Sequence, residues 1–148
     1  MKMKRLTLSE LTEEDTILID AARDATNLSY SPYSHFRVGA AVLLANGKIV
    51  KGANQENASY PVGICAERST IATAHNLFPD LPIVTLALAA KKKDGEYTQE
   101  PVTPCGMCRQ AIAECEKRYG KPIRILMASR SEIVVADNIK ELLPMTFT

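Results

Sequence analysis

Three cysteines and one glutamate occupy two short segments of the sequence, and their spacing predicts a metal site. Cys105 and Cys108 belong to the segment Pro-Cys-Gly-Met-Cys at residues 104–108, and Cys65 precedes Glu67 by two residues in a separate segment. Each segment falls at the expected start of a helix, where unpaired backbone N–H groups and the helix dipole favour thiolates and lower their pKa. Three thiolates with a vacant fourth position are typical of catalytic zinc, whereas structural zinc sites use four protein ligands.

The fourth cysteine, Cys115, is not expected to join this set. It follows Cys108 by seven residues on the same expected helix, which places it about 10.5 Å further along the helix axis. Zn–S bonds are about 2.3 Å long and cannot span that distance. We therefore interpret Cys115 as a small buried core residue. His35 and His75 are not required as ligands either.

Glu67 and Arg68 complete the predicted chemistry. Glu67 is expected to take the proton from a water that the metal activates, which makes the reaction a metal-assisted hydrolysis. Three thiolates and Zn²⁺ leave a net charge of −1, and Arg68 is expected to offset it by donating hydrogen bonds to the sulfurs. A redox Cys-x-x-Cys domain and a non-catalytic zinc-stabilised module remain alternatives. Glu67 argues against both, because a structural site has no use for a general base.

The surrounding pattern predicts the elements that must position these residues. Thr12 followed by three acidic residues is typical of a capped helix start, and apolar residues then recur at helical spacing as far as Leu28. Asn46-Gly47 between two β-branched, apolar runs predicts a hairpin with a type I′ turn. The expected helices span 12–28, 65–77 and 106–119, and the expected strands span 36–45, 48–54, 83–90, 123–128 and 133–136. Strands alternating with helices predict an α/β fold, a three-layer α/β/α sandwich with a mixed β-sheet.

Composition narrows the class of protein. The 148 residues are 46% hydrophobic and 24% charged, with 18 basic and 17 acidic side chains and a net charge of +1. We expect a single catalytic domain over residues 1–148, whose patterned part runs from about residue 8 to the end. The charge, the absence of tryptophan and the three phenylalanines argue against a polynucleotide partner, so a small molecule is expected.

No apolar run approaches the ~20 residues of a membrane span, and the basic N-terminus lacks a signal peptide's apolar segment. We therefore expect a cytoplasmic protein with reduced thiols.

At these residues the sequence resembles the zinc-dependent cytidine deaminase family, of the small homotetrameric nucleoside type. The Cys-Ala-Glu segment at 65–67 and the Pro-Cys-Gly-Met-Cys segment match the zinc deaminase signature. The similarity extends from residues 31–41 (Ser-Pro-Tyr-Ser-His-Phe, then Val-Gly-Ala-Ala at 38–41) to Leu-Leu-Pro at 142–144 and Phe147. It implies a cytidine deaminase-like fold, a homotetramer, and one Zn²⁺ per chain bound by Cys65, Cys105 and Cys108.

The resemblance also implies a reaction. Cytidine and 2′-deoxycytidine would be deaminated hydrolytically to uridine and 2′-deoxyuridine with release of ammonia, a step of pyrimidine salvage. Glu67 would act as the proton shuttle and protonate N3 of cytosine while the activated water attacks C4. A deaminase of another aminopyrimidine nucleoside, such as a blasticidin-type antibiotic, is the alternative enzyme.

Further residues are assigned to the substrate site by the same resemblance. Asn54 and Glu56 would hydrogen-bond the ribose hydroxyls, which favours an ordinary ribose, and Phe36 would pack on the base. Phe147 would reach into the site of a neighbouring subunit, and the main-chain carbonyl of Thr103, where serine is usual, would accept from the leaving amine. The remaining residues of the expected substrate site are Asn57, Ala58, Tyr60 and Ala66. Gln55 stands where an aliphatic residue is usual and could tune sugar preference. Arg109 and Gln110 are given only a packing role or a supporting role behind the residues of the site.

Overall fold

The computed structural model describes residues 3–148; Met1 and Lys2, at the start of the basic N-terminal segment and of the expected domain, lie outside the described residues. The helices and strands, in chain order, are β1 (Lys4–Thr7), α1 (Glu13–Ala25), β2 (Arg37–Leu44), β3 (Ile49–Ala53), α2 (Ala66–Leu77), β4 (Ile83–Lys91), α3 (Gly106–Tyr119), β5 (Arg124–Ala128) and β6 (Glu132–Ala136).

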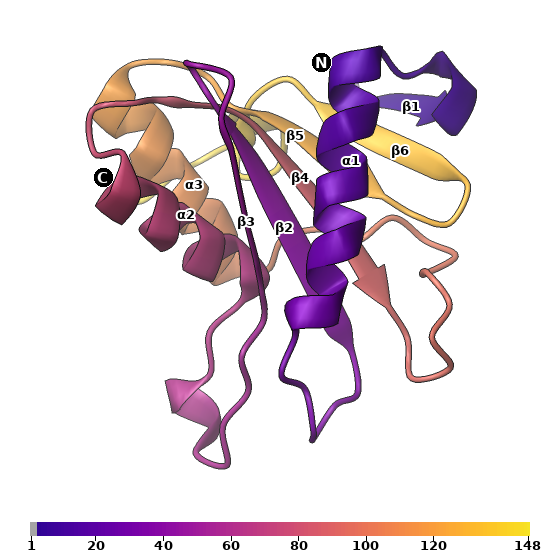
Figure 1. Ribbon diagram of the computed structural model, residues 1–148. Coiled ribbons are helices and arrows are strands. Elements are labelled where there is room, and N and C mark those ends of the chain that lie inside the picture. Colours follow the sequence, from indigo (N-terminus) through magenta and orange to yellow (C-terminus); the bar gives the residue numbers. More distant parts are fainter. Residues whose placement is uncertain (1–2) are drawn as a thin grey trace.

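All six strands form one sheet in the order β1-β6-β5-β4-β2-β3. β4 and β5 pair in parallel and the other neighbours pair antiparallel, so the sheet is mixed. Figure 1 shows α1 on one face of the sheet and α2 and α3 on the other. The prediction of a three-layer α/β/α fold is confirmed.

The alternation of side chains along the central strands divides the core between the two faces. In β2, Ala40, Val42 and Leu44 belong to the cluster on the α2 and α3 side, whereas Ala41 and Leu43 belong to the cluster beneath α1. Both sets are buried. Because successive side chains of a strand point to opposite faces, a strand covered on both sides must be apolar throughout, as the sequence is here.

Helix α1 begins where the sequence predicts and ends earlier. The Thr12 hydroxyl accepts a hydrogen bond from the Asp15 amide (3.1 Å), and the α-helix gives way to a single 3₁₀ turn at Thr26–Leu28. The helix lies directly against β2 at Gly39, where a Cβ atom would stand 2.1 Å from the Ala22 carbonyl oxygen. Glycine is therefore required at this position by the close approach of the two backbones.

The turn between β2 and β3 differs from the predicted type. A type I′ turn needs positive φ at both central residues, but His35 is the only non-glycine residue with positive φ among residues 3–148. Gly47 alone takes the left-handed conformation (φ +89°), and its amide donates to the Leu44 carbonyl while the Leu44 amide donates to the Lys48 carbonyl. The connection is thus a longer hairpin loop that ends in a left-handed glycine.

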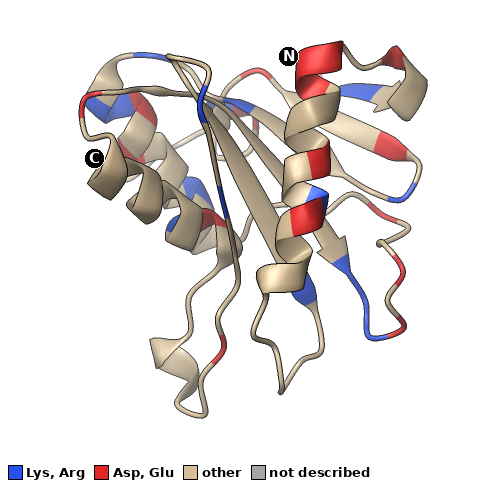
Figure 2. Cartoon of the chain, viewed as in Figure 1, with Lys and Arg blue, Asp and Glu red and all other residues tan. Residues whose placement is uncertain are grey.

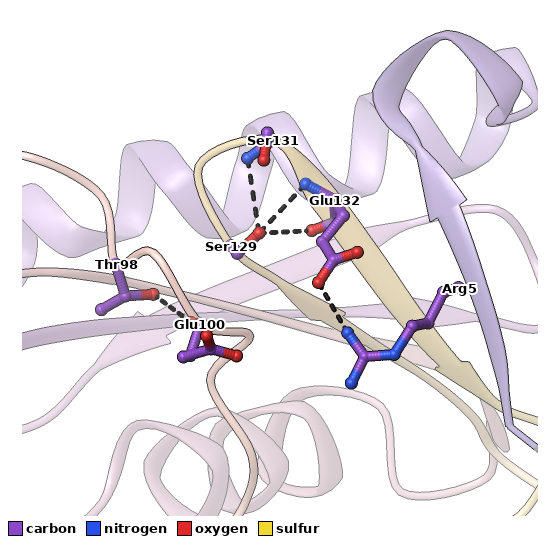
Figure 3. A network of polar contacts seen from close by, with 6 residues as sticks. All are labelled: Arg5, Thr98, Glu100, Ser129, Ser131 and Glu132. Carbon is purple, nitrogen blue, oxygen red and sulfur yellow. Dashed lines mark hydrogen bonds and ion pairs between the residues drawn. The ribbon is translucent and has the colours of Figure 1, made fainter.

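Strand β1 is not predicted by the sequence pattern, in which the first expected element begins at Thr12. It pairs antiparallel with β6 at the sheet edge, and Arg5 forms an ion pair with Glu132 (2.6 Å; Figure 3). The same view shows Ser129 accepting hydrogen bonds from the amides of Ser131 and Glu132. These contacts fix the β5–β6 turn, and a nearby loop is fixed by the Thr98 hydroxyl bonded to the Glu100 carbonyl.

The connections after β3 and β4 place two helix starts together. β3 and β4 run in the same direction because each is antiparallel to β2, and α2 follows β3 as α3 follows β4. Both helices therefore begin at the edge of the sheet formed by the carboxyl ends of these strands, which is where α/β folds place their sites.

Charge on the chain is mixed rather than gathered on one element. Figure 2 shows Lys and Arg on β1, β3, α3 and the loop after β4, with Asp and Glu along α1 and in several loops. None of the helices within residues 3–148 is both long enough and apolar enough to cross a lipid bilayer.

Candidate metal centre

The three predicted ligands meet at the two helix starts. Cys65 is the N-cap of α2, Cys105 is the N-cap of α3, and Cys108 lies in the first turn of α3. The Sγ atoms of Cys65 and Cys105 are 3.8 Å apart, those of Cys105 and Cys108 are 3.5 Å apart, and all three lie within 4.8 Å of one another. Tetrahedral zinc with Zn–S bonds of about 2.3 Å requires S···S separations of about 3.8 Å. The cluster therefore fits a zinc ion.

The predicted lowering of the thiol pKa values is confirmed for only one of the three cysteines. At Cys105 burial raises the pKa, but hydrogen bonds from the amide and thiol of Cys108 outweigh it and the net shift is downward. Burial raises the pKa of Cys65, and burial together with the Glu67 charge raises that of Cys108. At Cys65 and Cys108, burial and the neighbouring acidic groups therefore raise the thiol pKa by more than the helix ends lower it. A dication among the sulfurs reverses this balance, because a coordinating thiol is deprotonated.

Glu67 lies in the first turn of α2 and only 5% of its surface is exposed. Burial raises the pKa of its carboxyl, and the nearby Cys108 and Arg68 partly oppose the shift. A buried carboxyl with a raised pKa holds a proton more readily than an exposed one, which suits a group that takes and gives protons. Its place beside the sulfurs agrees with the proton-transfer role predicted for it.

Arg68 is the residue of the predicted centre whose contacts differ most from expectation. Within residues 3–148 no hydrogen bond joins its guanidinium to any of the three sulfurs, and its Nε is buried without a partner. Its positive charge lowers the pKa of Glu67. The offsetting of thiolate charge by Arg68 stays a prediction.

Cys115 lies outside the sulfur cluster, as predicted from the helix geometry. Its side chain is buried, its Sγ lies 3.9 Å from Nε2 of His75, and burial raises the pKa of the thiol to about 11. His75 packs between Cys115 and Arg118, whose Nη1 lies 3.4 Å from its Nδ1. Neither residue reaches the metal centre.

Asn54 joins the end of β3 to the segment before β2. Its Oδ1 accepts from the Val38 amide (3.0 Å) and the Ser29 hydroxyl (2.5 Å), and its Nδ2 donates to the Phe36 carbonyl (3.0 Å). Among residues 3–148 the second N–H of the amide has no hydrogen-bond partner. The side chain therefore holds the backbone of Phe36, which is itself partly exposed, and keeps one donor for another molecule.

Glu56 anchors the loop that precedes Phe36. Its carboxylate accepts from the amides of Tyr33 (3.0 Å) and Ser34 (3.1 Å) and from the Ser34 hydroxyl. The Ser34 hydrogen bond lowers the pKa of Glu56 and keeps it ionised. Tyr33, Ser34 and Glu56 line a pocket of about 400 Å³ together with Asn57, Tyr60 and Gly63. A nucleoside-sized molecule fits a pocket of this volume.

The other predicted substrate residues are mostly exposed. Asn57, Ala58 and Thr103 lie at the surface, Tyr60 is 77% exposed, and Ala66 is fully buried behind Cys65. Phe147 is 84% exposed at the end of the chain. Within one chain, then, Phe36, Asn54 and Glu56 share one loop cluster, whereas Phe147 is bound to α3 through its backbone.

Comparison with known proteins decides the family. The sequence model of the cytidine and deoxycytidylate deaminase zinc-binding region matches residues 12–119. The chain belongs to this deaminase family. The matched range contains both cysteine segments and Glu67, so the metal that the three thiols suit is zinc.

Relatives in the deaminase family cover nearly the whole chain. The cytidine deaminase of Halalkalibacterium halodurans is 40% identical over 133 residues, which are 89% of this chain and 92% of that protein. The crystal structure of cytidine deaminase from Burkholderia pseudomallei superposes with a TM-score of 0.77 at 34% identity, over 93% of this chain and all of that one. The blasticidin-S deaminase of Bacillus cereus is more distant, at 26% identity over 139 residues, 93% of this chain and 95% of that protein.

Two polar residues of this deaminase have contacts that the sequence did not indicate. Gln55, for which the sequence suggests an effect on sugar preference, donates from its Nε2 to the Leu28 carbonyl (3.1 Å). This hydrogen bond fixes the end of the 3₁₀ turn that follows α1. Gln110 bonds the backbone of Phe147. Neither partner is close in sequence, and no periodic pattern links them.

Proposed function

We propose that the chain catalyses the hydrolytic deamination of cytidine and 2′-deoxycytidine, which yields uridine or 2′-deoxyuridine and ammonia. The observation that supports this most directly is the cluster of three thiols at two adjoining helix starts, with the buried carboxyl of Glu67 beside it. One Zn²⁺ per chain, held by Cys65, Cys105 and Cys108, would supply Lewis acidity and a water of lowered pKa.

Glu67 supplies the proton transfers. Its carboxylate takes a proton from the attacking water and delivers it to N3 of the cytosine ring. The carboxylate then takes a second proton, from the hydroxyl added at C4, and gives it to the leaving amine, so that a carbonyl forms at C4 as ammonia departs. Burial raises the pKa of the carboxyl and so favours the protonated form that makes each delivery. Arg68, on the same helix turn, limits this rise because its positive charge stabilises the ionised carboxylate.

The loop cluster around the 400 Å³ pocket is proposed to bind the nucleoside. The free N–H of Asn54 can donate to a ribose hydroxyl, and the ionised carboxylate of Glu56 can accept from one. A sugar hydroxyl both donates and accepts, so an amide and a carboxylate together suit it. The Phe36 ring would pack on the base, the main-chain carbonyl of Thr103 would accept from the leaving amine, and Ala66 would line the site behind Cys65.

The assembly is proposed to be a homotetramer in which neighbouring copies complete one another's sites. Asn57, Ala58, Tyr60 and Phe147 are exposed in the single chain, and aromatic rings as exposed as Tyr60 and Phe147 are suited to contact another copy. We also propose that residues 1–148 act as a single catalytic domain in the cytoplasm, in pyrimidine salvage. The four cysteines are free thiols, as a reducing compartment requires.

Two matched cysteine substitutions test the metal centre. Cys108→Ala removes a proposed ligand and Cys115→Ala removes a buried thiol of the same helix outside the cluster. We expect Cys108→Ala to weaken zinc binding by at least about 100-fold and to abolish loss of cytidine absorbance. Cys115→Ala should keep about one zinc per chain and its activity. Zinc loss in both variants alike would contradict the ligand assignment.

A deaminase of another aminopyrimidine nucleoside is the second candidate. The similarity to the blasticidin-S deaminase of Bacillus cereus spans most of the chain, though at lower identity than the cytidine deaminases. Parallel assays of the zinc-loaded protein with cytidine, 2′-deoxycytidine and blasticidin S separate the two. Turnover of blasticidin S alone would replace the leading proposal.

A further inference from the structure

The last five residues, 144–148, are tied to α3 by a single side chain. Nε2 of Gln110 donates to the Phe147 carbonyl (2.9 Å), and the Phe147 amide donates to Oε1 of Gln110 (3.3 Å). One side-chain amide thus satisfies both main-chain groups of Phe147. In the described part of the chain these are the only hydrogen bonds made by residues 144–148.

This contact fixes the backbone of Phe147 and leaves its ring free. The side chain is 84% exposed and that of Met145 is 90% exposed, so the segment is not held by burial of its own apolar groups. Five residues before Phe147, the Leu142 carbonyl accepts a hydrogen bond from Nη1 of Arg109 (2.7 Å). Adjacent residues of α3 therefore hold both ends of the segment 142–147.

The same helix begins at the metal centre. Cys105 and Cys108 lie at its start, and Gln110 lies two residues after Cys108. Nε of Arg109 donates to the Pro104 carbonyl (2.8 Å) just before the first of these cysteines. The position of the Phe147 backbone is thus set from the rigid element that also carries two of the three thiols.

We propose that Gln110 is a positioning residue that presents the Phe147 ring to the substrate site of a second copy of this chain. The inference rests on the proposed function, in which Phe147 serves a neighbouring subunit. A free tail would lose backbone and side-chain freedom each time it entered a neighbouring site, and holding it in place beforehand removes part of that cost. The clamp needs an amide, because a single group must donate and accept at once.

Steady-state kinetics of three single variants and one double variant provide the first test. Gln110→Met keeps the length of the side chain and removes both polar atoms, and Phe147→Ala removes the ring. Gln99→Met is the matched control, because it makes the same change at an exposed glutamine in the loop after β4. We expect Gln110→Met to raise KM for cytidine about five- to tenfold, in line with the loss of one or two partly exposed hydrogen bonds. Its kcat and zinc content should stay close to the parent's, and Gln99→Met should match the parent throughout.

The double variant Gln110→Met/Phe147→Ala separates positioning from an independent effect on the helix. If Gln110 acts through the ring, the double variant is no more impaired than Phe147→Ala alone. Additive losses in the double variant would overturn the inference. So would an unchanged KM in Gln110→Met where Phe147→Ala is impaired, and this result would leave the proposed function standing.

Fluorescence tests the clamp without relying on turnover. The chain contains no tryptophan, so Phe147→Trp introduces a single indole at the tail. We expect its anisotropy to fall, and its quenching by acrylamide to rise, when Gln110→Met is added, while Gln99→Met changes neither. Equal anisotropy in the presence and absence of Gln110 would overturn the inference. Because this measurement needs no substrate, it also decides the clamp if the protein fails to deaminate cytidine.

Discussion

Replacing Gly39 by alanine should separate α1 from the sheet. A Cβ atom at this position would stand 2.1 Å from the Ala22 carbonyl oxygen, 2.6 Å from the Thr26 amide nitrogen and 3.0 Å from the Ala25 carbonyl carbon. All three are backbone atoms, so no rotamer change can relieve the overlap. The helix must retreat from β2 by roughly 1 Å to restore ordinary contact, in a core that is packed as densely as an organic crystal.

The loss in the free energy of unfolding depends on the packing that is disturbed when α1 moves away from β2. Leu18, Ile19 and Ala22 belong to α1, and their side chains are buried against the sheet. Overpacking typically costs 1–3 kcal/mol and occasionally more, and a clash of backbone with backbone places Gly39→Ala at the upper end, about 3 kcal/mol or more. For a chain of this length that corresponds to a fall in Tm of about 6–12 °C.

Urea and thermal unfolding followed by circular dichroism measure this loss. Gly106→Ala is the matched control, because a Cβ there meets no atom within 4 Å and the residue begins α3 with no left-handed conformation. The control should be as stable as the parent or slightly more so. A loss below about 1 kcal/mol for Gly39→Ala, comparable with the control, would refute the argument that α1 and β2 are in backbone contact here.

Two further predictions concern α1 and the end of α2. Asp15 is buried and accepts two hydrogen bonds from Arg124 (3.1 and 3.0 Å), so Asp15→Asn should cost about 1–3 kcal/mol in urea unfolding; an unchanged midpoint would contradict this. Burial, and then the Arg118 charge, lower the pKa of His75, so below the ordinary pKa of about 6.5 the unfolded chain binds the proton more readily. Stability should therefore fall as the pH drops from about 7.5 to 5.5, and His75→Phe should flatten that dependence; an equal slope in both proteins would show that His75 is not its source.

Local signals were sufficient to predict most of the elements. Helix α3 has the predicted bounds because Gly120, in the left-handed conformation (φ +66°), ends it. Strand β1 could not be predicted, since its four residues are stabilised by β6 at the other end of the sequence; the Arg5–Glu132 contact spans 127 positions. The predicted type of the β2–β3 turn was wrong, because Asn-Gly also occurs in longer hairpin loops that end in a left-handed glycine.

The candidate site, too, was only partly predictable from the sequence. The spacing of Cys65, Cys105 and Cys108 with Glu67 was enough to predict the sulfur cluster, because helix starts bring such residues together. The direction of the thiol pKa shifts was not predictable, since it depends on how deeply each sulfur is buried in the folded chain. The contact of Gln110 with the tail spans 37 positions and has no sequence pattern.

The most direct test is a paired measurement on the zinc-loaded parent and the Glu67→Gln variant. Both should contain about one zinc per chain and share the same circular dichroism spectrum, because the substitution removes a charge and no ligand. The parent should deplete the absorbance of cytidine and 2′-deoxycytidine, and the variant should be slower by about 10²–10⁴-fold, the range expected for loss of a general acid–base group. A zinc-replete parent that leaves both nucleosides unchanged, or a variant of near-parental activity, would contradict the account.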